Sequence, residues 1–393
     1  MTATRVAFTA IGGAKWTGGR NYLINLLGAV DRFESGRVRP VLFLGEDVGA
    51  EVAAPFEGMK NVEVVRSPAF DAARAPSRLR DAVLFGVARA AISEFERARI
   101  DVVFESATFY GWRSPFPTIA WIPDFQHRRL SSHFTRWGYW RREAGFQSQV
   151  ATGRTLMLSS EDARKDCELF YPNSKGRTGV VRFTSTVSPY LLEADPERTA
   201  AQYELPDHFF FLPNQFWTHK NHALVVDALS LLKQRGTMIV VAASGNPLDP
   251  RSPRHFQQLA GRVRELGLEE SFRVLGMIPR THLISLMRTC TAILNPSFFE
   301  GWSSTVEEAR ALGVPMILSH IGVHQEQMGD EAVYFDPTRP EALADLLVEA
   351  VAAARARPPE IRTALNNDVH VRRFASNFAD LVERARAGRS KSG

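Results

Sequence analysis

The sequence predicts an α/β protein of two successive domains, each with a parallel β-sheet covered by helices. The 393 residues are too many for one ordinary hydrophobic core and suit two domains of similar size. Short β-rich runs alternate with longer helical segments, which is the pattern of a parallel sheet with crossover helices. This alternation stops between Ser185 and Leu205 and starts again at Phe209. We therefore expect two Rossmann-like halves.

The first half contains β-rich runs separated by helical segments such as Asn21 to Val30 and Leu79 to Arg97. The expected strands are Arg5 to Thr9, Pro40 to Leu44, Val62 to Arg66, Asp101 to Glu105, Thr118 to Ile122, Thr155 to Ser159 and Gly179 to Phe183. The segment after them carries prolines and polar residues without a strand pattern, so we expect it to connect the domains.

The second half repeats this pattern and ends in a helix of mixed polarity. The expected strands are Phe209 to Leu212, Thr237 to Ala243, Phe272 to Leu275, Thr291 to Asn295, Pro315 to Ser319 and Ala332 to Phe335, and the expected helices are His222 to Gln234, Ser252 to Leu266, Thr281 to Arg288 and Val369 to Ala387. The expected boundaries are 1–188 for the first domain, 189–205 for a linker, 206–368 for the second domain, and 369–393 for the last helix and a frayed tail.

Composition is that of a soluble globular protein, with 45% hydrophobic and 23% charged residues. The sequence has no apolar run long enough for a membrane span and no signal-peptide pattern, so we expect a cytoplasmic protein. Cys167 and Cys290 lack metal-type spacing, and we expect reduced thiols and no metal site. The net charge of +5 is compatible with nucleic acid, anionic membranes or phosphorylated ligands. No nucleic-acid-binding motif accompanies it, and we expect no nucleic-acid partner.

Aromatic and cationic residues interleave between Gln126 and Arg142. One interpretation is a surface for a membrane or an acceptor. The other is a solvated helix face that packs its aromatic rings inward.

The stretch from Asn295 to Glu308 joins an expected strand to an expected helix and carries two glutamates, Glu300 in the loop and Glu308 on the helix. Ser303, Ser304 and Thr305 are candidate N-caps. Unpaired amides and the positive end of the helix dipole gather at such a junction, and ligands of open α/β sheets bind at the carboxyl ends of strands. An anionic ligand such as a nucleotide diphosphate therefore suits this position.

The two glutamates allow two interpretations. They could be a glycosidase pair, although their spacing does not set the carboxyl separation that hydrolysis requires. Alternatively, each carboxylate binds vicinal hydroxyls of a ribose or a sugar. Glu307 lies about 100° around the helix from Glu308 and should face solvent or a structural partner.

Three further segments follow expected strands. Gly18 and Gly19 belong to a glycine-rich loop that suits an anionic ligand or a simple turn, and the spacing is not a dinucleotide fingerprint. Lys220 follows the first strand of the second domain and could bind phosphate, with Asn214 or Gln215 hydrogen-bonding nearby. Asp124 and His127 follow a strand of the first domain and could position a hydroxyl, or be a helix cap and a surface histidine.

These residues together resemble a known family. Glu300-Gly-Trp-Ser-Ser-Thr-Val-Glu-Glu308-Ala, followed by Leu312-Gly-Val-Pro-Met, resembles the paired-glutamate motif of retaining glycosyltransferases of the GT-B fold, specifically glycosyltransferase family 4. The segment 214–222 is similar to that family's phosphate-binding lysine segment. The resemblance implies two Rossmann-like domains with a cleft between them and a C-terminal helix that returns to the first domain.

The resemblance also implies roles for individual residues. Glu308 would bind the ribose of a nucleotide sugar, Glu300 the hydroxyls of the donor sugar and Lys220 the diphosphate. The backbone around Gly301, Ser303, Ser304 and Thr305 and the Gly322 loop would complete the anion site.

Two departures from the family stand out. Gln215 replaces a frequent arginine, and Pro123-Asp124 replaces a His-Asp pair, with His127 as the nearest substitute histidine.

The function expected from the resemblance is transfer of a sugar, of the hexosyltransferase type, from a nucleoside-diphosphate sugar to a hydroxyl acceptor. We expect no tightly bound cofactor and no metal. The acceptor would be a glycan or lipid-linked molecule in polysaccharide, lipopolysaccharide or glycolipid biosynthesis, reached at the inner face of a membrane. The alternatives are a sugar-nucleotide epimerase of the same fold and a non-catalytic protein that binds nucleotide sugars.

Overall fold

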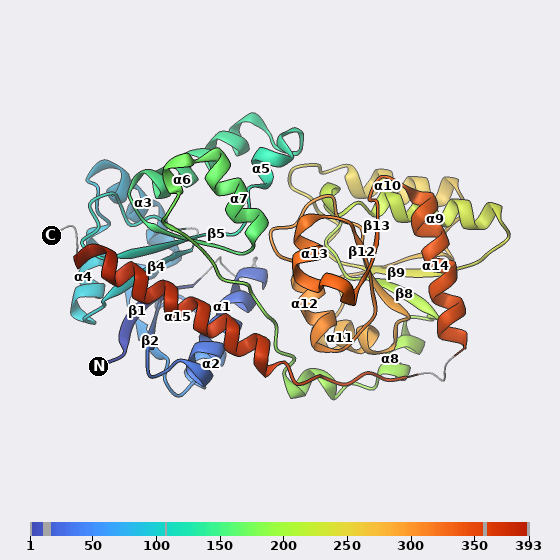
Figure 1. Cartoon of the computed structure of the whole chain (residues 1–393), viewed down its shortest axis with the longest axis horizontal. Coiled ribbons are helices and arrows are strands. Elements are labelled where there is room, and N and C mark those ends of the chain that lie inside the picture. The colour runs from blue at the N-terminus through green and yellow to red at the C-terminus, as the bar shows by residue number, and fades with distance from the viewer. Residues whose placement is uncertain (1, 11–16, 107, 357–359, 391–393) are drawn as a thin grey trace. The chain divides into compact units, whose positions relative to one another are not determined.

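The computed structural model describes residues 2–10, 17–106, 108–356 and 360–390, and these divide into two compact units (Figure 1). Unit 1 comprises residues 1–125, 136–184 and 368–393, and unit 2 comprises residues 126–135 and 185–367. The chain thus enters unit 2 twice and returns each time to unit 1.

Unit 1 is built on a seven-stranded sheet in the order β3-β2-β1-β4-β5-β6-β7, with parallel pairing between neighbours. Its central strands are buried on both faces, as expected for a parallel sheet covered by helices. The strands are β1 (Thr4–Thr9), β2 (Val38–Leu44), β3 (Glu63–Arg66), β4 (Val102–Ser106), β5 (Thr118–Ile122), β6 (Thr155–Leu158) and β7 (Thr178–Val180).

The α-helices of unit 1 lie between these strands and at the end of the chain. They are α1 (Thr17–Phe33), α2 (Ala50–Glu57), α3 (Ala75–Leu84), α4 (Arg89–Arg97), α6 (Arg136–Ala151), α7 (Glu161–Phe170) and α15 (Asp368–Ser390). The last helix packs against α1 (Figure 1) and buries Phe374 and Phe378 in the unit 1 core. The expected return of the C-terminal helix to the first domain is confirmed.

Unit 2 is built on a six-stranded parallel sheet in the order β10-β9-β8-β11-β12-β13. The strands are β8 (Phe209–Leu212), β9 (Val240–Ser244), β10 (Phe272–Gly276), β11 (Ala292–Asn295), β12 (Met316–Ser319) and β13 (Val333–Phe335). The helices are α5 (Gln126–Arg129), α8 (Pro196–Gln202), α9 (His222–Gln234), α10 (His255–Glu265), α11 (Arg280–Thr289), α12 (Ser304–Ala311), α13 (Gly322–Met328) and α14 (Pro340–Arg355).

The two-sheet architecture predicted from the alternating pattern is therefore confirmed, and each expected strand overlaps an observed one. The continuous helix expected from Leu79 to Arg97 is wrong, because the chain turns at Gly86 between α3 and α4. Gly86 has φ of +77°, and a Cβ there would lie 2.7 Å from Nε1 of Trp112. The glycine is thus required both by its backbone angle and by the close approach of another loop.

The expected linker, residues 189–205, is largely folded. A short 3-10 helix (Pro189–Leu192) and α8 occupy it, and Leu191 and Leu205 belong to the core of unit 2. Both cysteines are buried and free, as expected.

Candidate functional site

Unit 2 brings polar side chains together at the carboxyl edge of its sheet, between β8 and β11. These two strands are neighbours, and the strand order runs outward from them in opposite directions. Such a switch point is where open α/β sheets bind ligands, because the loops leaving the two strands diverge. Asn214 follows β8, and Asn295 is the last residue of β11. The loops that follow carry Lys220 and Glu300.

Lys220 and Glu300 form a nearly buried ion pair, with 2.6 Å between Nζ and Oε1 and side chains that are 12% and 8% exposed. Lys220 ends a short 3-10 helix ahead of α9. The next residue, Asn221, has a left-handed backbone (φ 55°), and its side-chain amide donates to the Pro296 carbonyl at 3.1 Å. The lysine loop is thereby attached to the loop that carries Glu300.

The Glu300 carboxylate is held from a second side by Ser297. The Ser297 hydroxyl lies 2.7 Å from Glu300 Oε1 and 2.6 Å from Asn295 Oδ1. Burial by itself raises the pKa of the Glu300 carboxyl, but the neighbouring groups, the Lys220 ammonium foremost, together outweigh burial and lower the pKa to about 2. The carboxylate is therefore charged at neutral pH and can act as a hydrogen-bond acceptor.

A network of amide and hydroxyl groups lies next to the pair. Asn214 Nδ2 donates to Asn295 Oδ1 (3.3 Å), and Asn295 Nδ2 donates to the Ser303 hydroxyl (3.0 Å). Thr305 Oγ1 lies 3.4 Å from Asn214 Oδ1. Asn214 and Thr305 thus join the loop after β8 to the first turn of α12, and this fixes the geometry around the predicted site.

Ser303 is the N-cap of α12, as predicted, and its hydroxyl accepts from Val306 N. The expectation that its own amide contributes to an anion site is wrong, because Ser303 N already donates to Gln327 Oε1 at 3.1 Å. The amides of Ser304 and Thr305, in the first turn, make no hydrogen bond to a described residue. These two amides are the donors that α12 offers to a ligand.

Glu308 makes an ion pair of its own, on α12. Its Oε1 lies 2.7 Å from Nη2 of Arg280, the first residue of α11, and the glutamate side chain is 11% exposed against 38% for the arginine. The two predicted glutamates therefore have different cations as partners. An arrangement in which the two carboxylates share one proton is not seen.

Glu307 has a structural partner, which was one of the two expectations for it. The side chain is fully buried, forms an ion pair with Arg310 and accepts from Gln327 Nε2 at 3.0 Å. Gln327 Nε2 also donates to the Ser303 carbonyl. This cluster anchors α12 against α13.

The side-chain oxygen of Gln215 is used in a contact between two loops. Its Oε1 accepts from Asn246 N at 2.9 Å, so the side chain clasps the loop after β8 to the loop after β9. The two loops touch closely, since a Cβ on Gly245 would lie 2.3 Å from the Asn214 carbonyl oxygen. The Gln215 oxygen thus has a structural contact, and a ligand contact of this residue would come from its Nε2 group.

His219 lies beside Lys220 and is buried. Burial, reinforced by the Lys220 charge, lowers the pKa of His219 to about 3, so the imidazole is neutral. Arg251 approaches His219 Nδ1 at 3.3 Å and is held by Asp249 at 3.1 Å. Arg251 also donates to Gln126 Oε1 at 2.7 Å, in the segment of unit 2 that contains the predicted His127.

The predicted residues that follow β1 and β5 belong to other segments, Asp124 and the glycines to unit 1 and His127 to unit 2. Asp124, in unit 1, is held by Arg142 at 2.6 Å. His127 lies in α5 and is fully buried, which rules out the surface-histidine interpretation. Gly18 and Gly19 occupy the first turn of α1, and the preceding loop, residues 11–16, lies outside the described residues.

Gly301 and Gly322 bracket the site in sequence. Gly301 lies in the turn between β11 and α12, and Gly322 begins α13 after β12.

Three contributors to the site were not found from the sequence: Ser297, Arg280 and His324. His324 is fully buried on α13, and its imidazole lies close enough to the Glu300 carboxylate for the two groups to interact electrostatically. The sequence offered only one signal for Ser297, its position just after a strand. It offered no signal for Arg280, because the residue that Arg280 contacts is distant in sequence.

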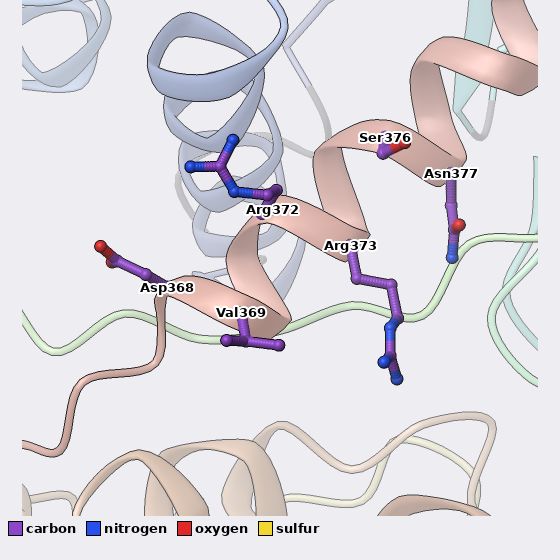
Figure 2. Close-up of a pocket in the computed structure, with 6 residues that line it drawn as sticks. All are labelled: Asp368, Val369, Arg372, Arg373, Ser376 and Asn377. Carbon is purple, nitrogen blue, oxygen red and sulfur yellow. The ribbon is translucent and has the colours of Figure 1, made fainter.

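A hollow of about 510 Å³ lies elsewhere, along the start of α15 in unit 1 (Figure 2). It is lined by Asp368, Val369, Arg372, Arg373, Ser376 and Asn377. The Arg372 side chain reaches toward α1, where its guanidinium lies 4.4 Å from the centre of the Phe33 ring. No predicted site residue lines this hollow.

The aromatic residues of α6 divide into two groups. Trp137 is 77% exposed and Trp140 is 61% exposed, whereas the Phe146 ring lies 5.6 Å from that of buried Phe125. The interpretation that these aromatic rings pack inward is thus wrong for the two tryptophans. Over the described part of the chain, no helix is long and apolar enough to cross a membrane, and no group of three or more metal-binding side chains is found.

Several known proteins are similar to part of this chain. Residues 197–357 match the family of glycosyl transferases group 1. The mannosylfructose-phosphate synthase of Agrobacterium fabrum is 28% identical over 130 residues, 32% of this chain and 29% of that protein. The D-inositol 3-phosphate glycosyltransferase of Corynebacterium glutamicum is 25% identical over 210 residues, 51% and 50% of the two chains. The chain thus spans half or less of the length of these curated relatives.

Solved structures resemble the whole chain. Alr3699/HepE of Anabaena, crystallised with UDP, is 13% identical, with a TM-score of 0.60 over 100% of this chain and 99% of that one. The sucrose-phosphate synthase of Thermosynechococcus elongatus is 15% identical, with a TM-score of 0.62 over 99% and 98%. At these identities the likeness shows the fold, which is that of the GT-B glycosyltransferases.

Proposed function

We propose that this chain, whose residues 197–357 carry a glycosyl transferases group 1 domain, is a retaining, metal-independent glycosyltransferase of glycosyltransferase family 4. It would move a sugar from a nucleoside-diphosphate sugar to a hydroxyl acceptor. The observation that carries the proposal is the Lys220–Glu300 pair at the switch point of unit 2, at 2.6 Å and nearly buried. The structural relatives crystallised with UDP support a nucleotide-sugar donor.

The contacts of the site assign a role to each group. Lys220 uses one of its three hydrogens on Glu300, so the others are available to a diphosphate. The amides of Ser304 and Thr305 are further donors for that anion. The second oxygen of Glu300 makes no hydrogen bond to a described residue and is available to a hydroxyl of the donor sugar. Glu308 would bind the ribose.

No side chain is needed as a covalent nucleophile in this proposal. The acceptor oxygen attacks the anomeric carbon from the face that the diphosphate leaves, so that the configuration is retained. The bond from this carbon to the phosphate oxygen breaks, the bond to the acceptor oxygen forms, and the acceptor proton passes to the departing phosphate. Negative charge grows on the diphosphate, and preorganised donors at such a position contribute about 3 to 4 kcal/mol each. Lys220 is the charged donor present.

A panel of UDP-, GDP-, ADP- and dTDP-sugars tests the donor assignment. A bound donor should raise the unfolding temperature, because a ligand that binds only the folded state stabilises it. Transfer or slow donor hydrolysis should accompany the shift. Failure of every donor to stabilise the wild type would contradict the proposal.

The variants Glu300→Gln and Glu308→Gln distinguish contacts to the donor sugar from contacts to the ribose. Glu308→Gln removes charge from the ribose contact and should weaken the nucleoside diphosphate and its sugar alike, by about tenfold for one charged hydrogen bond. Glu300→Gln should weaken the intact donor more than the diphosphate. Arg280→Ala is the matched test of the Glu308 partner and should weaken both ligands less than Glu308→Gln does.

A non-catalytic protein that binds nucleotide sugars is the second candidate. It is favoured by Gln215, whose side chain is occupied by Asn246 and adds no cation to the leaving group. Donor stabilisation without transfer or hydrolysis over a broad acceptor panel would favour it. Epimerised nucleotide sugar, detected by NMR, would instead indicate an epimerase of the same fold.

The acceptor is proposed to be a glycan or lipid-linked molecule at the inner face of a membrane, in polysaccharide, lipopolysaccharide or glycolipid biosynthesis. Support comes from Trp137 and Trp140, which are exposed on α6 in an arginine-rich stretch. Tryptophan and arginine suit the interface of an anionic bilayer. Co-sedimentation with vesicles containing phosphatidylglycerol should fall for the double variant Trp137→Ser/Trp140→Ser. Unchanged sedimentation would contradict the membrane contact.

A further inference from the structure

His324 places an unused hydrogen-bond acceptor beside the proposed donor site. It lies on α13, which follows β12, and its side chain is fully buried. Its Nδ1 lies 2.9 Å from the Ser319 carbonyl oxygen. A carbonyl oxygen only accepts, so Nδ1 carries the hydrogen, and in the neutral ring the lone pair is on Nε2.

The groups around Nδ1 support the assignment of the hydrogen to this nitrogen. The Ser319 hydroxyl donates to the Ser297 carbonyl at 2.6 Å, and its hydrogen is therefore not available to the imidazole. The chain of contacts runs from Glu300 through Ser297 and Ser319 to His324. The orientation of the imidazole is thus fixed by the same residues that hold the Glu300 carboxylate.

His324 Nε2 is buried and has no hydrogen-bond partner among the described residues. Leaving a buried acceptor unpaired costs on the order of 1 to 3 kcal/mol. Such a group at a ligand site indicates that its partner arrives with the ligand. The nearby charges are those of Glu300 and Lys220, which both act on the imidazole.

The chemistry of the missing partner follows from the charge of the ring. Burial lowers the pKa of His324, so the imidazole is neutral near pH 7 and Nε2 can only accept. The oxygens of an ionised diphosphate have no hydrogen to donate. Sugar hydroxyls do, and the adjacent Glu300 carboxylate is also an acceptor.

The geometry points to a subsite, formed by His324 Nε2 and the free oxygen of Glu300, that takes a hydroxyl of the donor sugar. The inference rests on the proposed function and deepens it, because it separates recognition of the sugar from recognition of the diphosphate. Solvent does not reach Nε2 in the ligand-free chain, so a side chain moves when the sugar enters. The Lys220–Glu300 pair is suited to this movement, since a diphosphate competes with Glu300 for Nζ.

The test compares the affinities for a donor and for its own nucleoside diphosphate by calorimetry, using the UDP-, GDP-, ADP- or dTDP-sugar that the wild type binds. His324→Phe keeps a ring of similar size and removes the acceptor. We expect the nucleotide sugar to bind about tenfold or more weakly, and the free diphosphate to stay within about twofold. Equal weakening of both ligands, or of neither, would overturn the subsite.

Two controls keep the result interpretable. His222→Phe changes another fully buried histidine of unit 2, stacked on Phe216 at 4.5 Å, and should alter stability without changing the ratio of the two affinities. If His324→Phe does not fold, deoxy-sugar donors are tested on the wild type and on His324→Gln, which keeps an acceptor. Loss of one hydroxyl must then weaken wild-type binding, and no effect at any hydroxyl would refute the subsite. A wild type that binds no donor would refute the proposed function itself.

Discussion

Each unit buries a carboxylate near the switch point of its sheet, and the two carboxylates are treated differently. Glu105, on β4 of unit 1, receives Arg154 through both oxygens, at 2.5 and 3.0 Å, and also Tyr110 N at 2.8 Å. The side chains of Glu105 and Arg154 are buried, with 0% and 4% of their surfaces exposed. Glu300 of unit 2 uses one oxygen, and its lysine partner has hydrogens to spare.

The difference teaches how to separate a structural ion pair from a binding one. Every guanidinium nitrogen of Arg154 is engaged, since Nη2 also donates to the Gly111 carbonyl and Nη1 donates to Thr152. A buried pair whose hydrogen-bonding groups are engaged within the protein offers little to a ligand, however polar it is. The Lys220–Glu300 pair keeps hydrogen-bonding capacity that a ligand can satisfy, and this capacity indicates a site.

Breaking the buried Arg154–Glu105 pair should give the largest effect, a loss of stability. Arg154→Met leaves the buried Glu105 carboxylate without its cation, which costs about 3 to 5 kcal/mol of stability. Denaturant unfolding and hydrogen exchange in β4 measure this loss, while donor affinity per folded molecule should be unchanged. A loss below about 1 kcal/mol would show that the pair is not structural.

Breaking the Lys220–Glu300 pair should lower activity more than stability. Lys220→Ala removes a charged donor from the leaving group and should lower kcat/KM by about 100- to 1000-fold. Its unfolding temperature should fall less than that of Arg154→Met. Lys233→Ala, on an exposed lysine that donates to the Leu266 and Gly267 carbonyls after α10, is the matched control and should keep activity. Near-normal transfer by Lys220→Ala would remove the phosphate site from the proposal.

Lowering the pH should lower the stability of unit 2. Burial lowers the pKa values of His219 and His222 from 6.5 to about 3. Their stabilising contribution is therefore complete above pH 6.5 and is lost as the pH falls from 6.5 toward 3, because the unfolded chain binds the protons first. The slope is about 1.4 kcal/mol per pH unit for each proton taken up. Faster hydrogen exchange in α9 at pH 5 than at pH 7, after correction for the intrinsic rate, would demonstrate it. An unchanged protection factor would contradict the assignment.

The smallest effect should come from Gln215→Ala. It removes one hydrogen bond between two loops and should cost about 1 kcal/mol of stability. The affinity for a nucleoside diphosphate should change little, because the Gln215 oxygen is engaged by Asn246 N and the side chain carries no charge. A tenfold loss of diphosphate affinity, measured by calorimetry, would show instead that Gln215 contacts the phosphates.

The strands and most helices could be predicted from the sequence, because buried parallel strands are short continuous apolar runs and the helices between them have clear ends. The break at Gly86 could not, since a glycine inside a helical pattern is often tolerated and the loop of Trp112 that meets it is distant in sequence. The expected linker was also missed as folded structure, because short proline-containing helices resemble loops in composition.

Within the site, the residue types were predictable and their partners were not. Lys220, Glu300 and Glu308 stand out because charged groups follow strand ends and begin a helix. Their pairing is set by the register of distant segments, which periodicity does not reveal. Arg280, 28 positions before Glu308, and His324, inside an ordinary helical pattern, therefore left no local signal.

The position of α15 has a consequence for how the protein is made. The ring of Phe378 lies 5.8 Å from the rings of both Phe8 and Phe104, in the centre of unit 1. Residues 185–367 leave the ribosome before this helix does, so unit 2 has nearly its whole sequence available while the core of unit 1 is still open. β1 must therefore wait for α15 before its apolar surface is fully covered. Synthesis of α15 is thus the step that completes unit 1.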